Sequence, residues 1–125
     1  GIRTSLETNG PDLLTKEAVC LKASCGAGHL DSIFRGLARI DLEKPAPSFE
    51  PIRERLEEME DRESLCTIFF SADARPEFQQ LLEKFRKEKR EFIWFCPVNR
   101  IVRPEINAGI RPYTRLIDVE EGGRL

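Results

Sequence analysis

The sequence predicts an α/β fold, a layered, open and mostly parallel sheet with flanking helices. Two unbroken apolar runs, residues 66–70 and 92–96, are typical of strands covered on both faces, as in parallel sheets. Between them, apolar residues recur at the i, i+3, i+4, i+7 spacing of an amphipathic helix: Phe78, Leu81, Leu82 and Phe85. The three elements therefore form a strand, helix, strand unit with a right-handed crossover.

A hairpin, or an edge pair of strands with a long loop, is predicted at the start of the chain. Residues 2–7 and 18–23 are expected to be its strands. Asn9 and Gly10 tolerate positive φ, which places the turn directly after the first strand.

Two helices are expected between the hairpin and the strand, helix, strand unit. A glycine-containing turn at residues 24–29 leads into the first, whose apolar face includes Leu30, Phe34 and Leu37. Pro51 suits the first turn of the second. Its narrow apolar stripe predicts a surface helix packed by one edge, with the residues Ile52, Leu56 and Met59.

The end of the chain is less regular. Residues 101–111 contain one proline and one glycine, are followed by a second proline at position 112, and receive no assignment, whereas residues 113–119 are expected to form an edge strand. At 125 residues and without a linker, the chain 1–125 is expected to be a single domain.

The composition excludes several classes of partner. Twenty Lys and Arg against twenty-two Asp and Glu leave a net charge of −2, which gives no reason to expect nucleic acid or an anionic membrane. No apolar stretch has the length of a membrane-spanning helix. The four cysteines lack zinc-site spacing and are expected to be reduced and buried in a cytoplasmic protein: Cys20, Cys25, Cys66 and Cys96.

Sites in open parallel sheets lie beyond the carboxyl ends of the strands, which directs attention to the segment from Ser71 to Asp73 and to residues 97–100. Asp73 has two interpretations, a helix N-cap or a metal or partner contact. The turn at residues 26–29 also has two, an anion cradle at a helix N-terminus or a plain tight turn. His29 and Cys25 are close in sequence, but no third group that would orient such a catalytic pair can be named.

Two other features favour structural interpretations. The basic residues between 84 and 90 alternate with glutamates, which is typical of a solvated helix face. Trp94 lies inside an apolar run and is expected in the core.

Three motifs in this order resemble one protein family: LETNG (6–10), CGAGHLDSIFRGLARIDL (25–42), and SAD (71–73) followed by a helix and FIWF (92–95). They are similar to the carboxyl-terminal part of the bacterial domain-of-unknown-function family fifty-eight, over roughly residues 2–98. The fold of that family is similar to a von Willebrand factor type A domain. The resemblance thus implies a partial type A-like or Rossmann-like sheet.

The resemblance also implies a metal position. Type A domains bind magnesium through an Asp-x-Ser-x-Ser loop, a Thr and a later Asp. Only Asp73 matches by position, His29 stands where Thr belongs, and the chain has no Asp-x-Ser-x-Ser loop. No metal or other cofactor is therefore expected in this segment, and magnesium is expected only with a longer parent that supplies the first strand upstream of Gly1. Without that central strand, exposed strand edges are expected to favour a homodimer or a domain swap.

Members of the family are commonly encoded beside MoxR-type AAA+ ATPases and often carry membrane spans ahead of the domain. The resemblance implies a non-enzymatic interaction module of a larger bacterial protein, on the cytoplasmic side, that acts with such an ATPase in assembly or maturation of a partner. The partner-proximal candidates are Ser71, Asp73, Gly26, Gly28 and His29. The alternative is a small α/β nucleotide- or phosphate-binding enzyme that uses the turn at residues 26–29.

Overall fold

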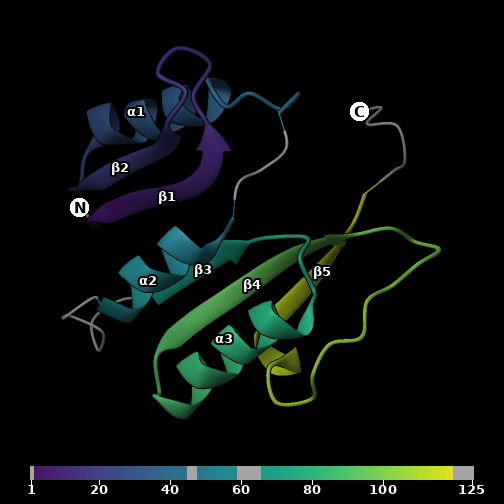
Figure 1. Cartoon of the computed structure of the whole chain (residues 1–125). Helices are drawn as coiled ribbons and strands as arrows, with labels where there is room; N and C mark the ends of the chain where they lie inside the picture. Colours follow the sequence, from purple (N-terminus) through teal and green to yellow (C-terminus); the bar gives the residue numbers. More distant parts are fainter. Residues whose placement is uncertain (1, 45–47, 59–65, 120–125) are drawn as a thin grey trace. The chain divides into compact units, whose positions relative to one another are not determined.

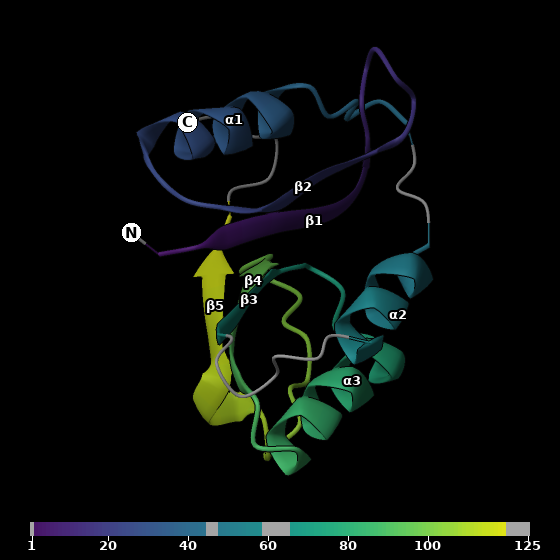
Figure 2. The same cartoon turned by 90° about the vertical axis from the view of Figure 1, so that its left-hand side faces the viewer.

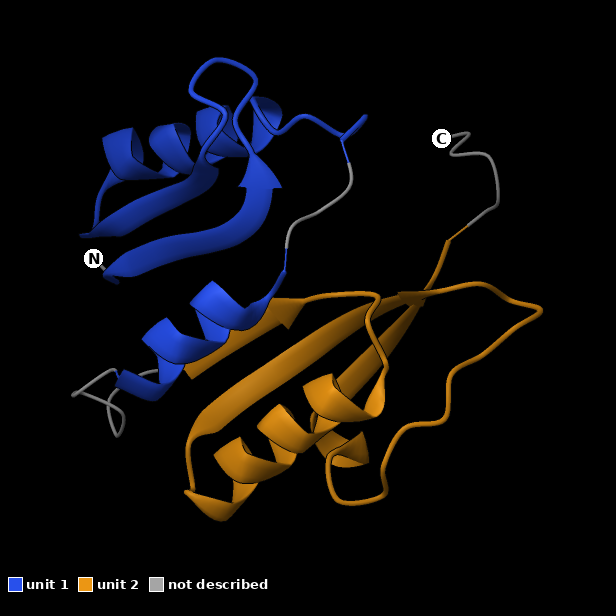
Figure 3. Cartoon of the chain, in the orientation of Figure 1, with its two compact units in different colours: residues 1–58 blue, residues 59–125 orange. Residues whose placement is uncertain are grey.

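The computed structural model describes residues 2–44, 48–58 and 66–119 of a mixed α/β chain (Figure 1). The elements in chain order are β1 (Thr4–Pro11), β2 (Ala18–Ser24), α1 (Ala27–Ala38), α2 (Glu50–Glu58), β3 (Cys66–Phe70), α3 (Pro76–Lys87), β4 (Glu91–Val98), a 3-10 helix (Arg111–Tyr113) and β5 (Thr114–Asp118). The chain divides into two compact units, residues 1–58 and 59–125 (Figure 3), and each is described by itself. The expectation of a single domain stays a prediction.

The first unit contains the predicted hairpin, with β1 and β2 antiparallel and α1 alongside them (Figure 2). The predicted turn position is wrong, because β1 continues through Asn9 and Gly10 to Pro11. The register shifts between Glu7 and Pro11, so a strand irregularity accommodates the Asn-Gly pair. The chain reverses later, where the Asp12 carboxylate accepts hydrogen bonds from the Leu14 and Thr15 N–H groups.

The helices of the first unit differ in how far they are buried. The apolar residues expected to pack α1, namely Leu30, Phe34 and Leu37, are exposed, and its buried residue is Gly36. A Cβ at Gly36 would come within 3.0 Å of Val19, so α1 approaches β2 closely at its smallest residue. Ile52 and Leu56 of α2 are buried as predicted, and Met59 lies outside the described residues.

The second unit is a three-stranded parallel sheet in the order β3, β4, β5. The predicted strand, helix, strand unit is confirmed, with Ile68 opposite Ile93 and α3 along one face of the sheet (Figures 1 and 2). Aromatic edge-to-face contacts fill the space between them, since the Phe69 ring lies 5.8 Å from Phe78 and 5.4 Å from Phe85. Trp94 is fully buried, as expected.

The connection from β4 to β5, which received no assignment from the sequence, covers the sheet on the same side as α3. Ile106 and Ile110 of this connection are buried. Gln79 of α3 holds it through side-chain hydrogen bonds to the Glu105 carbonyl (2.9 Å) and from the Asn107 N–H (2.8 Å). An irregular segment thus supplies the crossover between parallel strands that a helix usually supplies.

Three expectations about burial are corrected. Side chains on β3 and β4 alternate in burial, so these strands are not covered on both faces. Cys96 is buried, but the other three cysteines are exposed, because Cys20 lies on the hairpin, Cys25 in the turn before α1 and Cys66 on the edge strand β3. Arg90 is buried with its guanidinium 3.7 Å above the Phe85 ring, because it follows α3 and does not share the solvated face.

Candidate functional site

The loop after β3 is tied to the core and to itself. The Trp94 indole N–H donates to the Ser71 carbonyl over 2.8 Å, which fixes the end of the strand. The Ser71 hydroxyl accepts a hydrogen bond from the Asp73 N–H, and the Asp73 carboxylate in turn accepts one from the Arg75 N–H (3.0 Å). These hydrogen bonds hold the loop at the carboxyl end of the sheet, where sites are expected.

Asp73 is not the N-cap of α3, contrary to that interpretation. Arg75 occupies the cap position, and no side chain caps it. Both carboxylate oxygens of Asp73 instead receive the Arg75 guanidinium at 2.9 Å. These hydrogen bonds hold the pKa of Asp73 below its usual value.

The Asp73 carboxylate is paired with a cation of the chain itself. Arg75 donates to both of its oxygens, so a magnesium ion there would compete with the guanidinium for them. Within the described ranges, no group of three or more His, Cys, Asp and Glu side chains is placed to hold a metal ion.

Beside this loop, the sheet presents an apolar surface on the side opposite α3. We call it the open face, formed by the side chains of Ile68, Phe70, Ile93, Phe95, Pro97 and Ile117. Ile68 is 56% exposed and Phe70 is 74% exposed. The Phe70 and Phe95 rings stack with centroids 5.1 Å apart and an interplanar angle of 16°. Phe70, directly before Ser71, therefore lies mostly in solvent and stacks on a half-buried Phe95.

The open face is not predicted by the sequence. Residues 66–70 are apolar without alternation, a pattern from which a strand covered on both faces is expected. A continuous apolar run is compatible with a strand covered on both faces. It is equally compatible with a strand that has one uncovered apolar face, so the sequence does not distinguish the two.

The turn at residues 26–29 forms the start of α1. Gly26 adopts φ 94° at the N-cap position, a conformation that favours glycine, and no side chain caps the helix. A Cβ at Gly28 would meet nothing within 4 Å, so the second glycine is not required by close packing. His29 bonds through Nε2 to the Thr4 carbonyl on β1 and makes no hydrogen bond to Cys25.

A polar cluster links α2 to the hairpin. The Arg55 guanidinium forms an ion pair with Glu7 over 2.7 Å and lies 3.6 Å from the Cys20 sulfur. Although Cys20 as a residue is exposed, partial desolvation of its sulfur is the main cause that raises the pKa of the thiol. At neutral pH this thiol is therefore protonated and a weak nucleophile.

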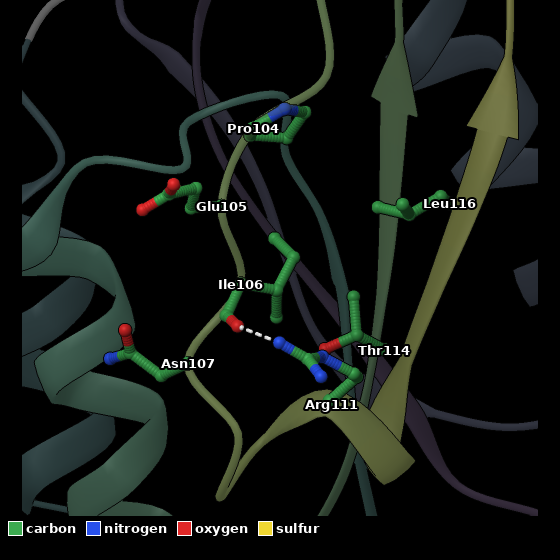
Figure 4. Close-up of a pocket in the computed structure, with 7 residues that line it drawn as sticks. All are labelled: Pro104, Glu105, Ile106, Asn107, Arg111, Thr114 and Leu116. Carbon is green, nitrogen blue, oxygen red and sulfur yellow. Dashed lines mark hydrogen bonds between the residues drawn. The ribbon is translucent and has the colours of Figure 1, made fainter.

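The second unit also contains a pocket of about 480 Å³ between the β4–β5 connection and β5 (Figure 4). Its lining residues are Pro104, Glu105, Ile106, Asn107, Arg111, Thr114 and Leu116. Arg111 donates to the Ile106 carbonyl, and the Thr114 hydroxyl donates to the Ile110 carbonyl, both over 2.9 Å. These polar groups are thus already engaged by the fold.

Fold and surfaces together define a mixed α/β chain with a parallel sheet, an ordered strand-end loop and an open apolar face. No family model, curated protein or solved structure matches the chain. In the parts of the chain that the structure describes, no helix is long and apolar enough to cross a membrane.

Proposed function

We propose that this chain is a non-enzymatic protein-interaction module of a larger bacterial protein. The observation that carries the proposal is Phe70, a large aromatic side chain that is mostly exposed and stacked on Phe95. An apolar patch on a folded surface is typical of a protein-binding site, because leaving it in water costs free energy that a partner recovers.

The neighbourhood of Phe70 has the composition of a binding hot spot. Aromatic and Arg side chains carry much of the energy at protein interfaces, and a polar rim surrounds them. Here the Phe70–Phe95 pair is the apolar centre, and the loop with Asp73 and Arg75 supplies the rim. The hydrogen bond from Trp94 to the Ser71 carbonyl favours binding, because it restrains the loop before a partner binds, so the loop would lose less conformational entropy on binding.

The partner that we propose is a MoxR-type AAA+ ATPase, with a role in assembly or maturation of a further protein. This choice rests on the resemblance to domain-of-unknown-function family fifty-eight and its type A-like fold. A cytoplasmic position follows from the same resemblance, since such an ATPase needs cytoplasmic ATP.

The nucleotide- or phosphate-binding alternative has less support. It rests on the N-terminus of α1, where Gly26 and Gly28 leave backbone N–H groups near solvent. His29, its candidate catalytic group, bonds through Nε2 to the Thr4 carbonyl. A saturable nucleotide-induced change in Trp94 fluorescence that Gly28→Val abolishes would favour this alternative.

The proposal is tested by calorimetric titration of the chain with a purified MoxR-type ATPase from the same genome, with and without ATP. We expect saturable binding that Phe70→Ser weakens by about tenfold or more, as for other hot-spot aromatics. Leu14→Ser is the matched control, because Leu14 is 80% exposed but lies in the hairpin turn.

Two results would contradict the proposal. If the chain shows no heat of binding at about 100 µM in either nucleotide state, the choice of partner is wrong. If Phe70→Ser and Leu14→Ser bind as tightly as the original chain, the binding surface is wrong.

A further inference from the structure

The outer edge of β3 has backbone groups without a strand partner. Among the described strands, β3 pairs with β4 alone. The Ser71 N–H donates to the Phe95 carbonyl of β4. The N–H and C=O groups of successive residues point to opposite sides of a strand, so those of residues 67 and 69 also face β4. The N–H and C=O groups of Cys66, Ile68 and Phe70 therefore face outward, and we call these groups the β3 edge.

The β3 edge lacks the features that protect other strands from pairing. Natural edges carry charged residues, prolines or bulges that discourage a second strand. β1 and β2 contain Glu7 and Lys22, and β5 contains Arg115 and Asp118. β3 reads CTIFF, without charge or proline, and its five residues pair with β4 in unbroken register.

We propose that the β3 edge pairs antiparallel with the β3 edge of a second copy of this chain. The inference concerns backbone groups at the edge and does not depend on the proposed function. Two-fold symmetry about Ile68 places Ile68 opposite Ile68 of the second copy, and Phe70 opposite Cys66 of the second copy. This register joins all three outward residues of each copy in paired hydrogen bonds, whereas a shift of the centre to residue 67 or 69 leaves one residue of each strand unpaired.

A second copy suits the β3 edge because β3 itself has no charged residue, so the two joined strands bring no charges together. In the proposed register, one row of the joined sheet runs from Arg115 through Phe95 and Phe70 to Cys66 and Glu91 of the second copy. The charges of such a row thus lie at its two ends, on strands that are not adjacent, and the central row contains only isoleucines of β3 and β4. No like charges lie opposite each other in this arrangement.

The expected association is weak. Pairing of two five-residue strands buries much less than the roughly 1,000 Å² that a stable interface needs. We therefore expect a dissociation constant on the order of 100 µM and a monomer in dilute solution. In a longer protein that brings two copies together, the same edge would act at a higher effective concentration.

The test is sedimentation equilibrium of the chain from about 10 µM to 1 mM, with a set of substitutions at residue 68. Ile68→Lys or Ile68→Glu places like charges opposite each other at the two-fold axis and should weaken the dimer at least about tenfold. An equimolar mixture of the two variants should restore it, because Lys then faces Glu. Ile117→Lys is the matched control, since Ile117 lies on the open face away from the β3 edge.

Each outcome of this experiment either supports or overturns the proposed pairing. A chain that is monomeric at 1 mM overturns the proposal, as does a dimer that Ile68→Lys leaves unchanged. If Ile117→Lys weakens the dimer as much as Ile68→Lys does, the copies meet through the open face and not through the β3 edge. Circular dichroism and thermal unfolding of every variant separate loss of pairing from loss of folding. Phe70→Ser tests the ATPase proposal and keeps the edge backbone, so either proposal can fail alone.

Discussion

Gln79 is a buried polar residue that joins two segments of the second unit. It lies on the buried side of α3 with 3% of its surface exposed. Its amide nitrogen donates to the carbonyls of Ala74 (2.7 Å) and Glu105 (2.9 Å), while its oxygen accepts the Asn107 N–H. One side chain thus joins the start of α3 to the β4–β5 connection.

Replacement of Gln79 by leucine should destabilise the chain. The variant keeps the side-chain volume but leaves two carbonyls and one N–H without their partner, which should lower the free energy of unfolding by about 2 kcal/mol. Urea unfolding followed by circular dichroism measures this value. Gln80→Leu is the control, because Gln80 is exposed on the same helix, and equal losses in both variants would contradict the role assigned to Gln79.

Sequence could not indicate this role. A glutamine among the apolar positions of an amphipathic helix is equally compatible with exposure, and its partners are backbone groups of a segment that shows no periodicity. The sequence places Asp73 in the loop after β3 but does not indicate its bonding partner. Its spacing from α3 is equally compatible with a helix cap and with a bidentate pair with Arg75.

At the scale of elements, β3 contains two adjacent phenylalanines in opposite environments. Phe69 packs against Phe78 and Phe85 below the sheet, whereas Phe70 lies on the open face. Phe69→Ala should cost about 3–4 kcal/mol of unfolding free energy, because it opens a cavity in the core. Phe70→Ala should cost less than about 1 kcal/mol, since it loses only the stack with Phe95.

Chemical denaturation of the two alanine variants checks this difference. A large loss of stability in Phe70→Ala would mean that something covers the open face in solution. The pair thus also tests the exposure on which the proposed binding surface depends.

The parallel β3, α3, β4 unit could be predicted because its signals are local and strong. Two apolar runs flank a helix with regular spacing, and short connections leave few alternatives. The hairpin turn could not be placed, because Asn9 and Gly10 suit both a tight turn and a strand irregularity. Which face of β3 and β4 is uncovered depends on where other helices pack, and residues 66–98 do not contain that information.

At the scale of the whole molecule, the two units differ in how much apolar surface they bury. Three of the described buried apolar side chains belong to residues 1–58, whereas eleven belong to residues 59–125. Buried apolar contacts determine how rarely a region opens. The second unit should therefore be the more stable part of the chain.

Native-state hydrogen exchange tests this expectation. Amides of β4 and α3 should exchange at least about tenfold more slowly than those of β1, β2 and α1. Protection factors that are equal in the two units would contradict it, and would mean that the chain opens as one cooperative body.

The Trp94 indole, which donates to the Ser71 carbonyl from a fully buried position, has a practical consequence. It is the single tryptophan of the chain, so intrinsic emission at long excitation wavelengths comes from this one ring. A ligand that displaces the strand-end loop would break the indole hydrogen bond and change the emission spectrum. The chain therefore carries its own fluorophore at the place where a partner is proposed to bind, without any added label.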